Sequence, residues 1–305
     1  MSGQFSRSPR VLLVGDVMRD IVVKPVRDLR KGTDTEAAIE IKPGGAAANQ
    51  AVWLGALGLN ARLVGRVGLQ DREELIADFT ANKVEAHLVP DPCRQTGTLV
   101  SLVHPDGERS FFTDRSANKN LCLADVPENA LDNVNLLMLS GYSYFAKEPR
   151  KVVRHLMQQA QNADIPVAID PASAGFLSDV GAKKFLDWTK GADIFFPNED
   201  EAELLSGQRD PEAQIEFFAE YFTLVVLKRG AKGALAGGGG IELILVEAPV
   251  VDVLDTTGAG DAFAAGFLAR HLRGEPLGAS LKGGVVAGAS AVQYLGGQPS
   301  DLLSI

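Results

Sequence analysis

One stretch of the sequence combines carboxylates with glycines directly before an apolar helix, and it reads Asp255-Thr256-Thr257-Gly258-Ala259-Gly260-Asp261. The glycines can adopt positive φ and carry no Cβ, so backbone N–H groups from Gly258 to Asp261 can converge on one point. That point is also a helix N-terminus, where unpaired N–H groups and the helix dipole favour an anion. A carboxylate beside an anion cradle suits phosphoryl transfer, because the cradle binds the phosphate and Asp261 can accept the proton of the attacking hydroxyl.

The same residues have a structural alternative, in which Asp255 or Asp261 caps the helix and the glycines allow close packing. The helix N-terminus is also expected to lower the pKa of Asp261, which would make it a weak base. A loose transition state tolerates a weak base, since little proton transfer is needed until the phosphoryl group has largely left its donor.

Two segments together resemble the ribokinase-like (PfkB) family of carbohydrate kinases. The stretch from Asp255 to Asp261 resembles the second signature of that family, and Gly44-Gly45-Ala46-Ala47-Ala48-Asn49 resembles the first. The resemblance extends from about Val11 to the end of the chain. It implies that Asp261 is the general base and that the backbone of Gly258, Ala259 and Gly260 stabilises the transferred phosphate.

The resemblance also implies a sugar pocket. Asp16 and Asp20 follow an expected strand, Val11–Gly15, at the strand end where ligands bind in open α/β sheets; solvated loop acids would look the same. Asn49 lies in an otherwise apolar helix and needs a partner, either a backbone group or a substrate hydroxyl. The implied substrate-binding residues are Asp16, Asp20, Gly44, Gly45, Asn49 and Asn118, with the two glycines as a candidate hinge.

A nucleotide and metal site is implied by three further segments. Asn198 and Glu201 fit the family's Asn-x-x-Glu signature for Mg²⁺, with Glu201 acting through water, although acids in the first turns of a helix also suit its dipole. The turn from Lys228 to Gly233 resembles the one beside the family's nucleotide, and a surface hairpin turn would look similar. The implied ATP-binding residues are Asn198, Lys228, Gly230, Gly233 and Thr257.

One loop of this implied site departs from the family pattern, and the family implies one further ion. The family often has Asp-Pro-Asn where this chain has Asp170-Pro171-Ala172-Ser173. The missing amide removes a phosphate contact that Ser173 could replace. The family also often uses a monovalent cation such as K⁺, for which the backbone carbonyls of Asp255 and Thr257 are the candidates.

The elements that must position these residues have an α/β pattern. The apolar strand before Asp16 is not followed by Gly-x-Gly-x-x-Gly, which argues against a dinucleotide-binding oxidoreductase. Later strands and helices alternate, which predicts a doubly wound, mostly parallel sheet with helices on both faces, as in the ribokinase-like fold. Two hairpins, the second turning at Pro105-Asp106-Gly107, predict a small β-sheet lid inserted as roughly 17–43 and 96–115 in a single domain over 1–305.

The composition narrows the range of possible binding partners and locations. The formal charge of −9 over 305 residues argues against nucleic acid, and no stretch approaches the roughly 20 apolar residues of a membrane span. Cys93 and Cys122 form no metal or redox motif, and the N-terminus does not resemble a signal peptide, so we expect a cytoplasmic protein. The four histidines are too scattered for a zinc site.

The expected function is ATP- and Mg²⁺-dependent phosphorylation of a hydroxyl on a free sugar or nucleoside. One alternative is a kinase of an acidic or already phosphorylated sugar, for which Arg19 and Arg115 would have to face the pocket. The other is a non-catalytic binding relative, which would be expected to lose Asp261 or the glycines. A homodimer formed through the lid is a further expectation.

Overall fold

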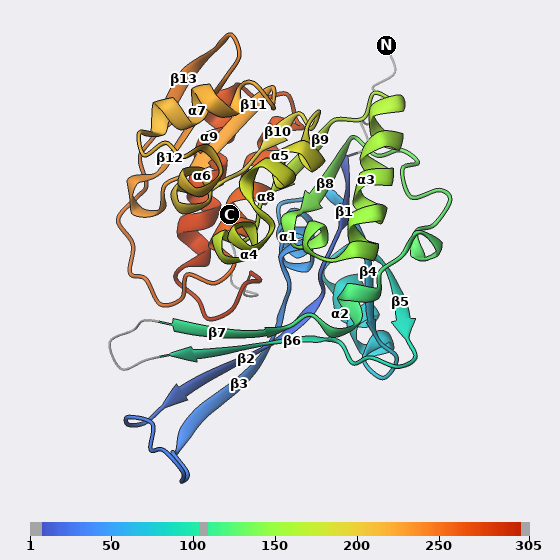
Figure 1. The fold of residues 1–305 in the computed structure, drawn as a ribbon, viewed down its shortest axis with the longest axis vertical. Coiled ribbons are helices and arrows are strands. Elements are labelled where there is room, and N and C mark those ends of the chain that lie inside the picture. Colours follow the sequence, from blue (N-terminus) through green and yellow to red (C-terminus); the bar gives the residue numbers. More distant parts are fainter. Residues whose placement is uncertain (1–7, 104–108, 300–305) are drawn as a thin grey trace.

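The computed structural model describes residues 8–103 and 109–299, which form two sheets and the helices that cover the larger one (Figure 1). The large sheet has nine strands in the order β13-β12-β11-β10-β9-β8-β1-β4-β5. Its strands are β1 Arg10–Val14, β4 Asn60–Gly68, β5 Val84–Asp91, β8 Leu136–Ser140, β9 Val167–Asp170, β10 Ile194–Phe195, β11 Leu224–Lys228, β12 Ala234–Gly238 and β13 Ile241–Val246. All neighbours are parallel except β11–β12 and β12–β13, which confirms the mostly parallel sheet.

Helices cover both faces of this sheet. Successive strand residues point to opposite sides, and both sets are apolar, so each face must be buried. In β1, Val11 and Leu13 pack in one core cluster and Leu12 and Val14 in the other. The first cluster includes residues of α1 Ala46–Ala56, α2 Arg72–Ala81, α8 Ala259–His271 and α9 Leu277–Ala291. The second includes residues of α3 Lys147–Asn162, α4 Ala174–Val180, α5 Ala182–Thr189, α6 Glu199–Ser206 and α7 Pro211–Phe218.

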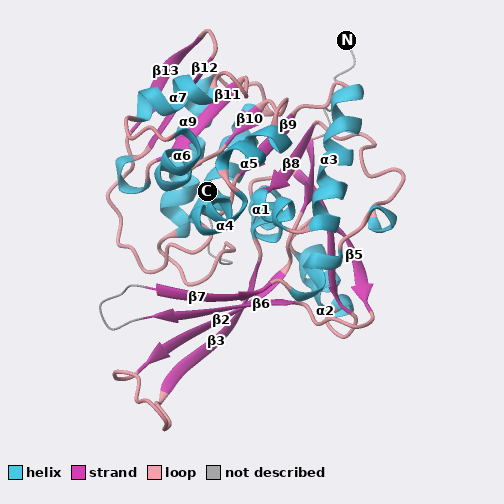
Figure 2. Cartoon of the chain, in the orientation of Figure 1, coloured by secondary structure: helices cyan, strands magenta, loops and turns pink. Residues whose placement is uncertain are grey.

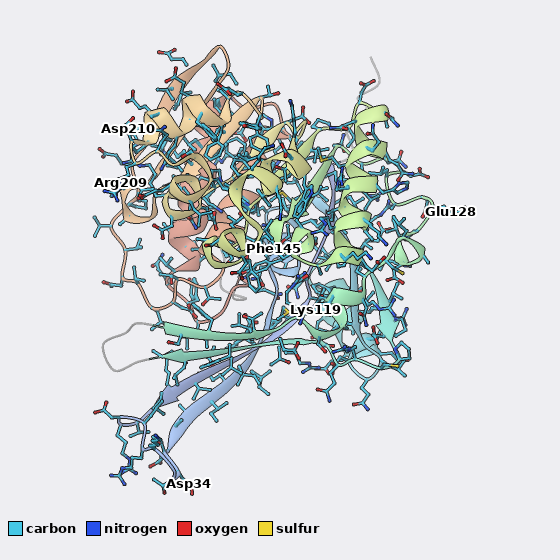
Figure 3. The ribbon with its side chains drawn as sticks, viewed as in Figure 1. Asp34, Lys119, Glu128, Phe145, Arg209 and Asp210 are labelled. Atoms are coloured by element: carbon cyan, nitrogen blue, oxygen red, sulfur yellow. The ribbon has the colours of Figure 1, made fainter. Side chains whose placement is uncertain are left out.

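The second, small sheet has the order β3-β2-β6-β7 and projects from the body of the molecule (Figure 2). Its strands are β2 Met18–Pro25, β3 Ala37–Gly44, β6 Gly97–Val103 and β7 Arg109–Asp114. They lie inside the two inserted ranges expected from the sequence, apart from the last residue of β3. Asp34, between β2 and β3, lies at the tip farthest from the helices (Figure 3). The expected turn at Pro105-Asp106-Gly107 lies outside the described residues.

The small sheet has an inner face of mixed polar and apolar residues and an outer face that carries an apolar row. Asp20, Leu99 and Thr113 lie side by side on the inner face, which borders the cavity described below. On the outer face, paired residues form an apolar row across all four strands, and these residues, which we call the outer row, are Ile41, Ile21, Val100 and Phe112. Ile41 and Phe112 are each 63% exposed.

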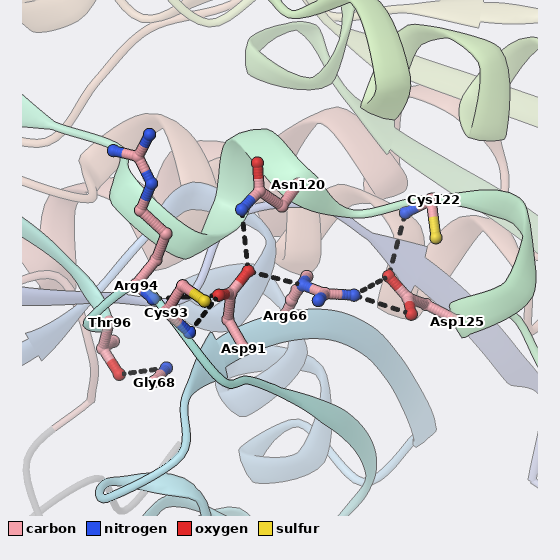
Figure 4. A network of polar contacts seen from close by, with 9 residues as sticks. All are labelled: Arg66, Gly68, Asp91, Cys93, Arg94, Thr96, Asn120, Cys122 and Asp125. Carbon is pink, nitrogen blue, oxygen red and sulfur yellow. Dashed lines mark hydrogen bonds and ion pairs between the residues drawn. The ribbon is translucent and has the colours of Figure 1, made fainter.

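A buried polar network holds the base of the small sheet to the large one (Figure 4). Arg66 of β4 donates to Asp91 at 2.9 Å and to both carboxylate oxygens of Asp125 at 2.9 Å. Asn120 donates to Asp91 at 2.8 Å. Burial raises the pKa of Asp91, but the hydrogen bonds it accepts from Asn120, the Cys93 N–H and Arg66 outweigh burial and hold that pKa well below its usual range. The network therefore fixes the short 3₁₀ helices Ser116–Asn120 and Leu123–Asp125.

Two further findings concern the cysteines and the length of the helices. Cys93 and Cys122 are free thiols. In the described part of the chain, no helix has both the length and the apolar character needed to cross a membrane.

Candidate active site

A cavity of about 810 Å³ opens between the carboxyl ends of the large-sheet strands and the inner face of the small sheet. It gathers residues from widely separated parts of the sequence, as expected for the edge of an open α/β sheet. The predicted site residues that line it are Asp16, Asp20, Gly45, Asn49, Asn198, Glu201, Lys228, Thr257, Gly258, Gly260 and Asp261.

A second cavity of about 540 Å³ lies beside the first. Gly230, Gly233 and Ala259 line it, together with an apolar wall formed by the exposed segment 248–253 and by residues of α8 and α9. The two cavities share four lining residues, which are Asn198, Lys228, Thr256 and Gly260. We call these four residues the shared border.

The turn before α8 lies close to two other segments of the chain. Gly258 is the N-cap, with φ of 74°, and a Cβ there would collide with the backbone of Gly297. A Cβ on Gly260 would lie 3.3 Å from the Lys228 Nζ, which places that ammonium against the first turn of the helix. Close approach and a positive φ therefore both require glycine at position 258, whereas Gly260 is helical and its nearest neighbour is the flexible Lys228 side chain.

Asp261 is half-buried, and two amides of α1 hold its carboxylate. Asn49 Nδ2 donates to Oδ2 at 3.0 Å and Gln50 Nε2 donates to Oδ1 at 3.1 Å. Burial and the nearby Asp170 carboxylate raise the pKa of Asp261 to about 7, against the lowering effect of the Asn49 and Gln50 hydrogen bonds and of Lys228. The expected lowered pKa is therefore wrong, because burial outweighs the helix N-terminus. A pKa near 7 suits a general base at neutral pH.

The amides of α1 combine a predicted residue with one that the sequence did not suggest. Asn49 was expected to contact a sugar hydroxyl; its Nδ2 contacts Asp261, while its Oδ1 is buried and has no partner among the described residues. Gln50 contributes the second hydrogen bond to Asp261, and its Oε1 is also buried without a described partner. A second polar residue in an apolar helix was the only sequence signal for Gln50.

Asp16 and Arg115 form a buried ion pair. Arg115 Nε and Nη2 donate to the two Asp16 oxygens at 2.6 and 2.8 Å, and both side chains are almost fully buried. Arg19 points away to the helix α2, where it pairs with Asp71 at 3.0 Å and Glu74 at 2.9 Å. Both arginines that could bind a charged acceptor are therefore neutralised by carboxylates of the protein.

Asp20 and Gly45 line one corner of the cavity, and Gly44, which does not line it, packs against the Asp20 carboxylate. Burial and the negative charge of Asp255 raise the pKa of Asp20 to about 7, and its Oδ1 has no partner among the described residues. A Cβ on Gly44 would collide with the Asp20 carboxylate, and one on Gly45, where φ is 96°, would collide with the Asp16 carbonyl. These contacts place Asp20 at the cavity wall with a free acceptor.

Asn118 and Asp255 connect backbone segments. The Asn118 side chain accepts from the Val17 N–H and donates to the Val17 carbonyl, both at 3.0 Å, and it is not among the residues that line the first cavity. Its amide fixes the segment between Asp16 and Met18. Asp255 accepts from the Thr257 N–H at 2.8 Å and from the Gly296 N–H at 2.9 Å, so its side chain joins the catalytic turn to the chain near Gly296.

The segment near Gly297 packs behind the amide that contacts Asp261. Trp53 Nε1 donates to the Gly297 carbonyl at 3.0 Å, across 244 positions of sequence. A Cβ on Gly297 would collide with the Asn49 amide. Gly297 is therefore held by α1 and in turn confines the amide that contacts Asp261.

Asn198 and Glu201 form a reciprocal cap on α6. The Asn198 side chain accepts from the Glu201 N–H at 2.8 Å, and the Glu201 side chain accepts from the Asn198 N–H at 2.9 Å. Burial raises the pKa of Glu201 to about 7. The structural alternative for these residues is thus present, while both also line the cavity. No group of three or more His, Cys, Asp or Glu within 8–103 and 109–299 is arranged to hold a metal ion.

Asp170 and Lys228 form an ion pair at the centre of the site. Lys228 Nζ lies 2.6 Å from Asp170 Oδ2, and both side chains are nearly buried. Ala172, which stands at the position of the family's amide, has φ of 80° and donates its N–H to Asp170 Oδ1 at 3.1 Å. Ser173 lines the cavity beside it.

The chain is similar to known proteins over nearly its whole length. A family model described as "pfkB family carbohydrate kinase" matches residues 8–303. The chain is 28% identical to the ATP-dependent 6-phosphofructokinase of Thermoanaerobacterium thermosaccharolyticum over 295 residues, covering 94% of this chain and 88% of that protein. It is 28% identical to the ribokinase of Bacillus subtilis over 293 residues, covering 94% of each chain.

Solved structures share the fold at lower identity. Adenosine kinase from Sinorhizobium meliloti superposes with a TM-score of 0.87 at 24% identity, with 97% of each chain covered. A putative ribokinase II from E. coli in complex with ATP and Mg²⁺ superposes with a TM-score of 0.83 at 24% identity, with 95% of this chain and 94% of that chain covered.

Proposed function

The chain belongs to the pfkB family of carbohydrate kinases and is a sugar or nucleoside kinase, and we propose that it transfers the γ-phosphoryl group of ATP to a hydroxyl of an uncharged acceptor. The observation that carries this is the placement of Asp261, a half-buried carboxylate held by Asn49 and Gln50 at the mouth of a glycine turn, with a pKa raised to about 7. A non-catalytic relative has no need of such a base, and this chain keeps both the base and the glycines.

We assign the two substrates to the two cavities. The nucleotide occupies the second cavity, where the small residues Gly288 and Ala289 leave room for adenine. Its terminal phosphate reaches the shared border, against the backbone of Gly258 and Gly260. The acceptor occupies the first cavity, where Asp20 and Asn49 each present a buried oxygen with no described partner. Such oxygens suit sugar hydroxyls, which donate hydrogen bonds.

The reaction then needs one proton transfer. The acceptor hydroxyl gives its proton to Asp261 while its oxygen forms the new bond to the γ-phosphorus, and the bond to the ADP oxygen breaks with its electrons remaining on ADP. Asn49 and Gln50 orient the base. Mg²⁺ would be held near Glu201 and Asn198, a carboxylate and an amide oxygen that suit this ion, and would neutralise the triphosphate charge. The carbonyls of Asp255 and Thr257 stay the candidates for K⁺.

The paired arginines support an uncharged acceptor. Arg115 is engaged by Asp16 and Arg19 by Asp71 and Glu74, so neither is available for a second phosphate. The cavity also presents several acids, which would repel it, at about 1 kcal/mol or more for each close like-charge pair at intermediate dielectric. The 6-phosphofructokinase relative keeps the charged alternative open.

An acceptor panel tests this function. Ribose, fructose and nucleosides are compared with fructose 1-phosphate, fructose 6-phosphate and 2-keto-3-deoxygluconate by ADP release at saturating MgATP. We expect the highest kcat/KM for a neutral compound. A charged compound with kcat/KM at least tenfold above every neutral one would refute the uncharged acceptor.

A variant pair tests the base. We expect Asp261→Asn to lower kcat at least about 10²-fold with its own best acceptor, while MgATP binding is kept. Asp179→Asn, which changes an exposed acid of the same cavity, is the control and should turn over like the parent. Parent-like turnover by Asp261→Asn would remove Asp261 from the mechanism.

We also propose that two copies pair through the small sheet. The outer row is apolar on every strand and half-buried or exposed throughout. A two-fold axis through its centre would lay this row on the same row of a second copy, which is how isologous interfaces form. Exposed apolar sheet faces of this kind mark interaction sites. A second copy would cover the outer face and leave the inner, cavity-lining face free.

A further inference from the structure

The Lys228 ammonium lies where the two cavities meet. Lys228 ends β11 and lines both cavities. Its side chain is 12% exposed and its Nζ lies against the first turn of α8, within 3.3 Å of where a Cβ on Gly260 would be. The same ammonium donates to Asp170 at 2.6 Å. A lysine ammonium has three donors, so this contact leaves donors for another oxygen.

Lys228 is surrounded by acids. The carboxylates of Asp170, Glu201 and Asp261 all stabilise its positive charge. Lys228 is the only Lys or Arg among the described residues that line the first cavity. Arg229 lines the second cavity but pairs with Glu199 at 3.1 Å. The transferred phosphate, which brings further negative charge to the shared border, therefore has one nearby cation of the protein.

We propose that Lys228 binds the transferred phosphoryl group, exchanging part of its contact with Asp170 for the non-bridging oxygens of that group. This rests on the proposed kinase function. In the transfer, the phosphorus moves from the ADP oxygen to the acceptor oxygen, the proton goes to Asp261, and Lys228 stays protonated. It follows the phosphoryl group on its flexible stem and balances charge spread over the equatorial oxygens.

A purely structural ion pair is the competing explanation. Buried ion pairs add little net stability, but removing one partner is costly because the other is left buried and charged. The two explanations therefore differ in what Asp170 does. If the pair is only structural, loss of Asp170 and loss of Lys228 should have similar effects on stability and turnover. If Lys228 binds phosphate, loss of Asp170 frees the ammonium, whereas loss of Lys228 removes it.

The first experiment needs no acceptor. Binding of ADP and of the β,γ-imido analogue of ATP, both with Mg²⁺, is measured by calorimetry for the parent, Lys228→Met and Lys232→Met. Lys232 lies on the same turn, is 65% exposed and pairs with Glu199, so it is the matched control. We expect Lys228→Met to lower the affinity for the analogue at least tenfold more than the affinity for ADP. An unchanged ratio of the two affinities would overturn the assignment.

The second experiment measures turnover at pH 9, well above the pKa of about 7 of Asp261 in the parent, and repeats it at pH 10 to check that each variant has reached its plateau. This matters because Lys228 also lowers the pKa of Asp261. We expect Lys228→Met to lose at least about 10²-fold in kcat, the usual loss for one transition-state donor, with the acceptor KM within threefold. Asp170→Asn should stay within about tenfold of the parent. The double variant Asp170→Asn/Lys228→Met should regain the thermal stability that Lys228→Met loses. Its kcat should stay as low as that of Lys228→Met.

The outcomes separate this inference from the kinase function. Recovery of kcat in the double variant, or turnover of Lys228→Met within threefold of the parent, would show that the ion pair is only structural. A parent that phosphorylates no acceptor would count against the proposed function, while the ratio of ADP and analogue affinities would still decide the role of Lys228.

Discussion

Replacing Gln50 by Leu should shift the pH dependence of the reaction without touching either substrate. Gln50 is 1% exposed, donates one hydrogen bond to the Asp261 carboxylate, and is not among the residues that line either cavity. Leu has a similar size and cannot donate. The change also removes a buried Oε1 that has no partner among the described residues, so the variant is expected to fold.

The size of the shift follows from that hydrogen bond. A hydrogen bond to a charged group contributes about 1.5–3 kcal/mol, and 1.36 kcal/mol corresponds to one pKa unit. Loss of the Gln50 bond disfavours the carboxylate form, so the pKa of Asp261 should rise from about 7 by about 1–2 units. At pH 7 the ionised fraction would then fall from about one half to about one tenth or less.

The assay is kcat/KM for the acceptor between pH 5.5 and 10, which reports the base in the enzyme without acceptor. We expect the rising limb of Gln50→Leu to lie about 1 unit or more above that of the parent, with equal plateaus at high pH. Gln214→Leu, a change at another buried glutamine in α7, is the control and should leave the midpoint unchanged. A uniform loss of kcat/KM with an unshifted midpoint would refute the assignment of Asp261 as the titrating base.

Three other perturbations test separate parts of the structure. Burial raises the pKa of Asp261 to about 7, so folding stability should fall as pH rises from about 4 to 7 through this residue. Asp261→Asn should therefore raise Tm more at pH 8 than at pH 5, and calorimetry showing an equal or smaller rise at pH 8 would contradict this. Gly260→Val should lower kcat by crowding Lys228 and the phosphate, whereas Phe111→Ala should act mainly on acceptor affinity; equal kcat losses with unchanged acceptor Kd would contradict this. Phe112→Lys should convert a dimer to a monomer in sedimentation, and an unchanged sedimentation coefficient would argue against pairing through the outer row.

The fold and the positions of the main site residues were predictable because their signals are local. The alternation of apolar strands and helices appears in the sequence itself, and the glycines before Asp261 predict a turn at the start of a helix. The pKa of Asp261 was not predictable, since it depends on burial by segments far away in the chain. The same holds for the pairing of Arg115 with Asp16, 99 positions apart, and for Gln50 as a partner of the base.

Other expectations await experiment. The single-domain division, the K⁺ site and the cytoplasmic location stay predictions. For Asn118, the sequence suggested a substrate contact, whereas its amide pairs with the Val17 backbone. A local motif can identify such a residue but not which neighbour the folded chain supplies, because that neighbour lies about a hundred positions earlier.

The contacts that hold Gly297 affect how the enzyme matures. The Asn49–Asp261 bond spans 212 positions and the Trp53–Gly297 bond spans 244, so the base acquires its partners only when early and late segments have met. Contacts of such long separation form slowly. A growing chain on the ribosome would thus carry the first signature long before it could turn over ATP. Catalytic activity would then report completed tertiary assembly, where helix content alone would not.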